Sequence, residues 1–395
     1  MRCAIRPLTI VMRLQTTEIQ QLDGWSVAAP VDARCAVRSR LTRAVALSLL
    51  TIAGCVHRPP AEFDQSQVFS LSCRQLDPTD APPVHWAAPA DSAFSVRLSR
   101  WCATVGPVYF IANPRVVDGP PIDRLAIVSW NIHEGRGHVT DLIHRLRAGE
   151  FTGGESIRNF VLLLQEATRR GHGVPPTIPA GYPAPRRIEG PAESQDAGVH
   201  TLADEGLAIL YAPSMRNGEH AVEDRGNAIV SSLPLSDPTL VELPIERQRR
   251  VAIVSSVAGS DRTGKRWHLG LIDVHLDTAL ALLHGGPFEA RRRQVVALLD
   301  ALRPLEALNT PGRPAVIAGD FNTWKGNGEP AIKLLREEFG DATDPMEAPT
   351  WTGPLGLHAT LDQIFVRGIL TRSAVTRLPA TFGSDHYPLL TVVAF

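Results

Sequence analysis

From residue 125 onward, short apolar runs alternate with polar loops at the spacing of buried β-strands. Several runs are almost continuously apolar, which indicates strands covered on both faces. The predicted strands are 125–130, 160–164, 207–211, 228–231, 251–257, 267–274, 315–318, 363–366 and 389–393, and the predicted helices are 139–146, 287–302 and 330–339. Many strands with few helices predict two stacked sheets with helices packed outside them.

The composition is that of a folded globular protein, because 44% of the residues are apolar and 21% are charged. The formal net charge is −1, so the whole molecule has no general electrostatic attraction to nucleic acid. All five cysteines (Cys3, Cys35, Cys55, Cys73 and Cys102) precede residue 103. This excludes a thiol nucleophile or a zinc–thiolate site in the region of the strands.

Residues 38–55 have the layout of a bacterial export signal: arginines, then a short apolar run, then small residues before Cys55. The alternative is a buried or amphipathic helix that ends in a cysteine. The ending Ile52-Ala53-Gly54-Cys55 resembles the lipobox of bacterial lipoproteins, which implies cleavage before Cys55 and acylation of its thiol. Residues 1–36 lack a periodic apolar pattern, and we interpret them as the product of a start codon assigned too early.

Three segments follow from this reading: a mis-assigned start with a signal peptide (1–55), a tether with a small extension (56–120), and a catalytic domain (121–395). The tether is inferred from proline and polar residues between 57 and 90. Cys73 and Cys102 would be thiols of the exported protein, either joined in a disulfide or unpaired.

Polar side chains follow the predicted strands at the points where the strands end, where a rigid sheet can direct them into one site. They are Asn131, Glu166, His275, Asp320, Asn322, Asp385 and His386. Hard cations such as Mg²⁺ prefer oxygen ligands, which Glu166, Asn131 and Asp385 could supply. Hydrolysis of a phosphoester further needs an oriented water and donors for developing negative charge. Asp320 could orient that water, and the imidazoles could move protons or stabilise charge.

The motifs WNIHEG, LLLQE, GNAIVSS, DVHLD, AGDFN, LDQIF and GSDHYP, in this order, resemble the endonuclease/exonuclease/phosphatase superfamily over about residues 125–395. The resemblance implies an α/β fold, a four-layer α/β/β/α sandwich of two packed mixed β-sheets with flanking helices. It implies that Asn131 and Glu166 bind the metal, with Glu166 the principal ligand. His275 would be the first catalytic histidine, and Glu205 the carboxylate that orients it.

The same resemblance implies that Asp320 orients water, that Asn322 contacts the phosphate, and that Asp385 and His386 form the terminal pair. Asp362 would hold the ring of His386. Two further assignments are looser. Arg249 or Arg250 lies where some members place an arginine on the phosphate, and Asn227 is equally compatible with a structural and a substrate-binding role.

We therefore expect a Mg²⁺- or Mn²⁺-dependent phosphoester hydrolase, a nuclease-like phosphodiesterase acting as a monomer. It would be anchored in the bacterial cell envelope by an N-terminal lipid and face outside the cytoplasm. Two alternatives remain: an enzyme acting on phospholipids or small phosphate esters, and a non-catalytic lipoprotein that uses the same fold to bind a ligand.

Overall fold

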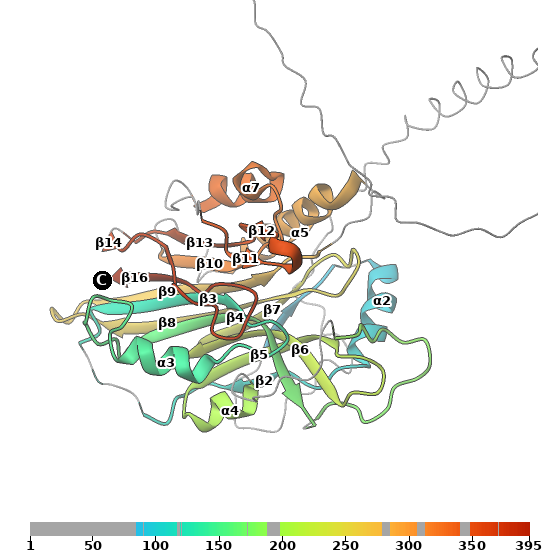
Figure 1. Ribbon diagram of the computed structural model, residues 1–395, viewed down its shortest axis with the longest axis horizontal. Coiled ribbons are helices and arrows are strands. Elements are labelled where there is room, and N and C mark those ends of the chain that lie inside the picture. Colours follow the sequence, from blue (N-terminus) through green and yellow to red (C-terminus); the bar gives the residue numbers. More distant parts are fainter. Residues whose placement is uncertain are drawn as a thin grey trace, which may run out of the picture. The chain divides into compact units, whose positions relative to one another are not determined.

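Two mixed β-sheets pack face to face and carry helices on their outer surfaces (Figure 1). The computed structural model describes residues 84–89, 91–116, 119, 121–171, 173–187, 198–278, 285–305, 313–339, 348–369 and 371–395. All of these belong to one unit, Arg58–Phe395. The predicted signal segment, Cys55 and Cys73 lie outside the described residues.

The first sheet has the strand order β14-β16-β3-β4-β6-β5-β2, with β15 paired to β16. The bounds are β2 Tyr109–Ile111, β3 Arg124–Asn131, β4 Phe160–Arg170, β5 Ala208–Arg216, β6 Glu223–Ser231, β14 Thr371–Arg372, β15 Thr376–Arg377 and β16 Leu389–Ala394.

The second sheet has the order β1-β7-β8-β9-β10-β13. Its bounds are β1 His85–Ala87, β7 Ser236–Glu242, β8 Val251–Ser260, β9 Arg266–His275, β10 Ala315–Asp320 and β13 Asp362–Arg367. A small hairpin of β11 (Trp351–Thr352) and β12 (His358–Ala359) stands apart from both sheets in the pairing.

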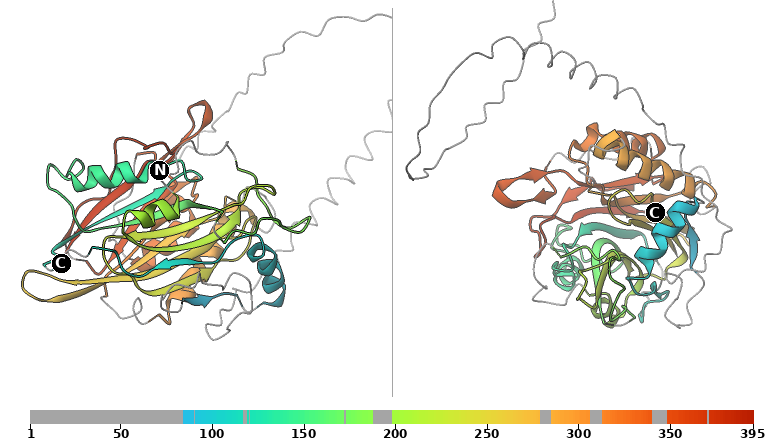
Figure 2. Two further views of the ribbon diagram at one scale, coloured as in Figure 1. Left: turned by 90° about the horizontal axis from the view of Figure 1, so that it is seen from below. Right: turned by 90° about the vertical axis from the view of Figure 1, so that its right-hand side faces the viewer.

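Three apolar layers hold the sandwich together. Between the sheets, Ile127 and Leu163 of the first belong to one cluster with Ile253 and Leu271 of the second. On the outer face of the first sheet lie α3 (Val139–Arg147) and α4 (Val199–Asp204). On the outer face of the second lie α5 (Gly286–Leu302) and α7 (Pro330–Phe339), as the orange helices in Figure 2 show. The expected four-layer α/β/β/α sandwich is thus confirmed.

The region before the predicted catalytic domain contributes to both sheets. Strand β1 pairs with β7, and β2 pairs with β5. Helix α2 (Ser92–Cys102) buries Phe94 and Leu98 in a cluster with Met215 and Ile245. Cys102 is disulfide-bonded. None of the helices in the described ranges has the length and hydropathy needed to cross a membrane.

Sequence patterns located the long elements and the edge strand β13 but missed β7, the helices α2 and α4, and the short strands β1, β2, β14 and β15. The predicted helices 287–302 and 330–339 agree with α5 and α7, whose apolar spacing is regular. The stretch 171–204, rich in glycine, proline and polar residues, contains α4, which no apolar pattern predicts. This helix has only six residues, too few for a helical period to stand out from the surrounding glycines and prolines.

Strand direction brings the chemistry to one edge. Strands β3 and β4 are parallel, with Asn131 opposite Gln165, and β9 and β10 are parallel, with His275 opposite Asp320. Strand β13 runs antiparallel to β10 and therefore begins at this edge, with Asp362 opposite Asp320. The segment before β16 reaches the same edge, because β16 is antiparallel to β3.

Candidate active site

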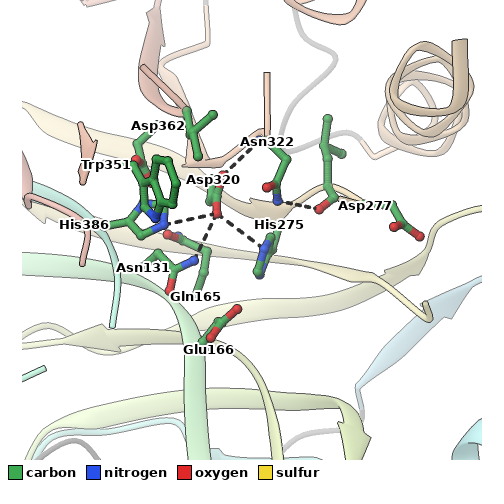
Figure 3. A network of polar contacts seen from close by, with 12 residues as sticks. Asn131, Gln165, Glu166, His275, Asp277, Asp320, Asn322, Trp351, Asp362 and His386 are labelled. Carbon is green, nitrogen blue, oxygen red and sulfur yellow. Dashed lines mark hydrogen bonds and ion pairs between the residues drawn. The ribbon is translucent and has the colours of Figure 1, made fainter. Parts of the chain in front are cut away.

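Asp320 lies at the centre of a buried polar network (Figure 3). Its Oδ2 accepts a hydrogen bond from Asn131 Nδ2 at 2.9 Å, and its Oδ1 accepts one from the backbone N–H of Asn322 at 2.8 Å. Two imidazoles flank the same Oδ2, with His275 Nε2 at 3.5 Å and His386 Nε2 at 3.8 Å. Predicted residues from four strand ends, those of β3, β9 and β10 and the segment before β16, therefore meet around one carboxylate.

The backbone at Gly319 explains why glycine precedes this aspartate. Its φ is +151°, and an added Cβ would lie 1.8 Å from the carbonyl oxygen of Val274 on β9. Only glycine tolerates so close an approach of two parallel strands. Gly319 therefore sets the position of Asp320 beside the end of β9.

Two site residues have left-handed backbone conformations, Asn322 with φ 52° and Glu166 with φ 58°. At Glu166 the pairing of β4 with β6 shifts register between Leu164 and Ala167. Such a bulge redirects a side chain from the regular pleat, and unfavourable conformations of this kind are retained mainly at functional positions. The bulge directs the Glu166 carboxylate toward the network of Figure 3.

His386 is held by a carboxylate on the side of its ring away from Asp320. Its Nδ1 lies 2.8 Å from Asp362 Oδ2, which also accepts a hydrogen bond from Thr350 Oγ1 at 2.6 Å. Burial alone would lower the pKa of His386, but the charges of Asp362 and Asp320 outweigh it and raise the pKa to about 10. Burial, and then the charge of Asp362, raises the pKa of Asp320 to about 7. The site thus favours a protonated His386 beside a carboxylate with increased basicity.

His275 has the opposite character. Burial, and then the positive charge of Arg250, lowers the pKa of His275 well below its ordinary value. The Arg250 guanidinium lies with Nη1 3.1 Å from His275 Nδ1. The two histidines around Asp320 are therefore set to different protonation states.

The residues predicted as metal ligands lie on the first-sheet side of the network. Burial raises the pKa of Glu166, an effect offset in part by the charges of Arg250 and His133, and one carboxylate oxygen accepts the backbone N–H of Glu134 at 2.9 Å. Asp385 is partly exposed, with Oδ1 2.5 Å from His133 Nδ1. Burial alone would raise the pKa of Asp385, but the hydrogen bond from His133, the charges of His386 and His133 and the hydrogen bond from Trp351 together outweigh it and lower the pKa.

Glu205 does not lie at this edge, which corrects its assignment as the carboxylate that orients His275. It is exposed at the end of α4, just before β5. Strand β5 begins with Ala208 opposite Ser231, and Ser231 is opposite Val161 near the start of β4. The segment before β5 therefore lies at the far edge of the sheet from Glu166, because β5 runs in the same direction as β4.

The two candidate arginines directly precede β8 and make different contacts. Arg249 is fully buried. Its Nε donates a hydrogen bond to the Glu242 carboxylate at 3.0 Å, and its Nη1 donates one to the Pro213 carbonyl at 2.8 Å. Arg249 is therefore a structural residue, which corrects its assignment to the substrate. Arg250 instead reaches His275.

Asn227 lies buried between the sheets, where its Nδ2 is 3.4 Å from the Asp273 carbonyl oxygen. This contact joins β6 to β9. It favours a structural role for Asn227 over a substrate-binding role. A neighbouring contact does the same: Gln165 Nε2 donates to Asp273 Oδ1 at 2.6 Å. These amides tie the two sheets together directly behind the site.

Sequence reasoning gave no role to His133, Trp351 or Thr350, all of which contact predicted site residues. His133 could have been found, because it follows Asn131 by two residues at the end of a strand. No sequence pattern indicated a role for Trp351, since the pairing of its hairpin with residues 385–387 is what brings it to the site.

Comparison with known proteins agrees with this geometry. A family model described as the Endonuclease/Exonuclease/phosphatase family matches residues 128–386. The uncharacterized protein YbhP of Escherichia coli (strain K12) is 28% identical over 183 residues, which are 44% of this chain and 64% of that protein.

Two solved structures are similar at low identity. The endonuclease/exonuclease/phosphatase from Beutenbergia cavernae is 19% identical, with a TM-score of 0.46 over 69% of this chain and 72% of that chain. The human nocturnin catalytic domain with bound sulfate anion is 18% identical, with a TM-score of 0.44 over 69% of this chain and 96% of that chain. On the strength of the family match over residues 128–386, the chain belongs to the endonuclease/exonuclease/phosphatase family.

Proposed function

We propose that this protein is a divalent-metal-dependent phosphodiesterase with nuclease-like chemistry. The observation that carries the proposal is the pair of imidazoles on Asp320 Oδ2, one favouring the neutral state and one the protonated state. An acceptor between two donors is the arrangement that in-line attack of water on a phosphoester needs.

Each residue has a distinct task in this mechanism. Asp320, with its raised pKa, orients the attacking water and takes its proton. His386, kept protonated by Asp362, donates to a phosphoryl oxygen as negative charge develops there. Neutral His275 donates from Nε2 to the same group of oxygens. Asn322, held by its backbone bond to Asp320 and by its side-chain bond to the Leu276 carbonyl at 3.0 Å, contacts the phosphoryl group beside them.

The donor set fits a hard cation such as Mg²⁺ or Mn²⁺. Glu166 and Asp385 offer carboxylate oxygens, and Asn131 an amide oxygen, which are the ligands such ions prefer. Asp320, Asp362 and His386 also bring ligand atoms within 4.8 Å of one another. We assign the last two to hydrogen bonding, because the 2.8 Å between Asp362 Oδ2 and His386 Nδ1 leaves no room for an ion between them. When bound, the cation would neutralise charge on the phosphoryl oxygens.

We further propose that the protein is exported and anchored to the bacterial cell envelope through Cys55, facing outside the cytoplasm. The layout of residues 38–55 supports this, as does the disulfide at Cys102, since disulfides persist mainly in oxidising compartments. Cys55→Ser should move the protein from the membrane fraction to the soluble fraction of cells. Unchanged membrane partitioning would refute acylation at this residue.

Hydrolysis assays on the full chain test the enzymatic proposal. Plasmid DNA, sphingomyelin, phosphoinositides and a chromogenic phosphodiester are incubated with Mg²⁺, with Mn²⁺ and with EDTA. We expect metal-dependent cleavage of DNA or the chromogenic diester, and loss of roughly a hundredfold or more in Asp320→Asn and His386→Ala. Cleavage confined to lipid substrates would favour the phospholipid alternative. Binding without hydrolysis of any substrate would favour a non-catalytic lipoprotein.

A further inference from the structure

Large apolar side chains are exposed beside the active site. Trp324 is 47% exposed, Leu357 is 56% exposed, and Leu355 at the tip of the β11–β12 hairpin is fully exposed. Trp351 at the base of the same hairpin is half-buried. Apolar groups gathered next to polar catalytic residues usually mark the place where part of a ligand binds.

The hairpin is fixed to the catalytic segment through its backbone. Thr352 N donates to the Asp385 carbonyl at 2.9 Å, and Tyr387 N donates to the Thr350 carbonyl at 2.7 Å. The indole N–H of Trp351 donates to Asp385 Oδ2 at 2.9 Å. The ring of Trp351 therefore has a set position relative to His386, as its place beside that histidine in Figure 3 shows.

Trp324, from the segment after β10, contacts Trp351. It follows Asn322 by two residues, and its ring meets that of Trp351 edge to face, with centroids 5.3 Å apart and planes at 78°. An added Cβ at Gly353 would lie 2.0 Å from the Trp351 indole, so glycine there leaves room for the ring. We call these two residues the tryptophan pair.

The position of the tryptophan pair indicates which part of a bound substrate would contact it. The Trp351 ring is hydrogen-bonded to Asp385, the residue before His386, and Trp324 follows Asn322 by two residues in the chain. A group attached to a phosphorus held between His386 and Asn322 therefore lies against the pair. The Trp324 side chain is 47% exposed, and a flat aromatic substituent gains attraction by stacking on such a ring.

We propose that the tryptophan pair is a substrate subsite, and that the phosphoester cleaved here carries an aromatic ring close to the phosphorus. This inference rests on the proposed function, because it assumes that the phosphoryl group binds at Asp320. It makes Trp324 and Trp351 residues that determine specificity rather than catalytic residues.

Direct binding of two non-hydrolysable ligands tests the proposal. Phenylphosphonate and methylphosphonate share the phosphonate group and differ in the ring. Their dissociation constants are measured by titration calorimetry on the full chain with Mg²⁺ or Mn²⁺. The ratio of the two constants cancels any effect on the phosphoryl group itself. In the wild type we expect phenylphosphonate to bind on the order of tenfold more tightly, the effect of one ring stacking on an aromatic side chain.

The variants separate the ring contact from general damage. Trp324→Ala should reduce the ratio several-fold, Trp324→Phe should retain most of it, and Gly353→Ala should reduce it by displacing Trp351. Val96→Ala, at an exposed apolar residue of α2, is the control and should keep the wild-type ratio. Thermal melting of each variant checks that the fold is intact.

The outcomes distinguish this inference from the proposed function. If neither phosphonate binds and no phosphoester is hydrolysed, the proposed function fails and this inference fails with it. If hydrolysis is present but both phosphonates bind equally, or Trp324→Ala keeps the wild-type ratio, only the aromatic subsite is overturned. Butylphosphonate binding more tightly than phenylphosphonate would also overturn it, in favour of an alkyl substituent.

Discussion

Arg250 Nη1 donates a hydrogen bond to Nδ1 of His275 across 3.1 Å, and this contact determines which nitrogen of the imidazole carries the proton. A guanidinium has no acceptor, so Nδ1 must present its lone pair and the hydrogen of the neutral ring lies on Nε2. That N–H faces Asp320 Oδ2 at 3.5 Å. His275 is thereby a hydrogen-bond donor toward the reacting group and cannot accept a proton at Nε2.

Replacing Arg250 should impair catalysis without unfolding the protein. Arg250→Met removes the donor and one positive charge, so the pKa of His275 should rise and its tautomer should no longer be fixed. We expect kcat/KM to fall by roughly ten- to a hundredfold, the usual effect of losing a partner that orients a site residue. Steady-state kinetics and the imidazole NMR signals of His275 measure both effects. A wild-type pKa for His275 in this variant would contradict the assignment.

The neighbouring Arg249 should behave in the opposite way. Arg249→Met leaves the buried Glu242 carboxylate without its ion pair, since the two side chains are 1% and 0% exposed. Removing one partner of a buried pair costs about 3–5 kcal/mol of unfolding free energy. Urea denaturation should show this loss, while kcat/KM of the folded fraction stays within a few-fold of wild type. If Arg249→Met were as stable as the wild type but inactive, the result would instead support a role for Arg249 in substrate binding.

Two glutamates predicted to be functional offer a matched test of the metal site. Glu166→Gln should weaken Mn²⁺ binding and activity on the order of a hundredfold, because it removes a charged oxygen ligand. Glu205→Gln, the same change on the exposed far edge of the sheet, should alter neither. Metal titrations followed by calorimetry and activity assays measure both. Equal effects of the two substitutions would argue against Glu166 as the principal ligand.

The stability of the metal-free protein should depend on pH through His386. Its pKa is raised from 6.5 to about 10 in the folded chain, so folding favours the protonated ring. This contribution is complete below pH 6.5 and is lost as the pH rises toward 10. In EDTA, the unfolding free energy of the wild type should therefore decline across this interval more steeply than that of His386→Gln. Parallel curves for the two proteins would show that His386 titrates normally.

Gly319→Ala should destabilise the fold at the end of β10. The new methyl group would lie 1.8 Å from the Val274 carbonyl oxygen, so the strands must separate. Overpacking of this kind costs about 1–3 kcal/mol or more. Gly328→Ala is the control, because its nearest neighbour, Lys325 Cβ, lies 4.0 Å away. Thermal melts of both variants provide the comparison, and equal melting temperatures would show that β10 can shift without cost.

The position of a residue along a strand was predictable from the sequence, whereas the direction of the strand was not. Asn131, His275 and Asp320 were located because each follows a long apolar run, and parallel strands bring such ends together. Glu205, assigned from the resemblance alone, precedes a strand that runs toward the site, so it lies at the opposite edge of the sheet.

Contacts that depend on two distant segments left no local signal. Arg249 and Arg250 are both buried, and neither apolar spacing nor charge indicates that the first pairs with Glu242 while the second reaches His275. The contact between Trp351 and Asp385 likewise depends on a hairpin whose strands are two residues each. Such short pairings are stabilised by the surrounding fold rather than by their own sequences.

The edge at which β3, β4, β9 and β10 end has a consequence for loss of activity under stress. Asn131 and Glu166 belong to one sheet, His275 and Asp320 to the other, and no single sheet holds a complete site. The packing of the apolar side chains between the sheets therefore determines the distances between the catalytic residues of one sheet and those of the other. In mild acid or denaturant, a state that keeps its strands but loosens its core should already be inactive. Near-ultraviolet circular dichroism and enzymatic rate should disappear together, while the far-ultraviolet signal persists.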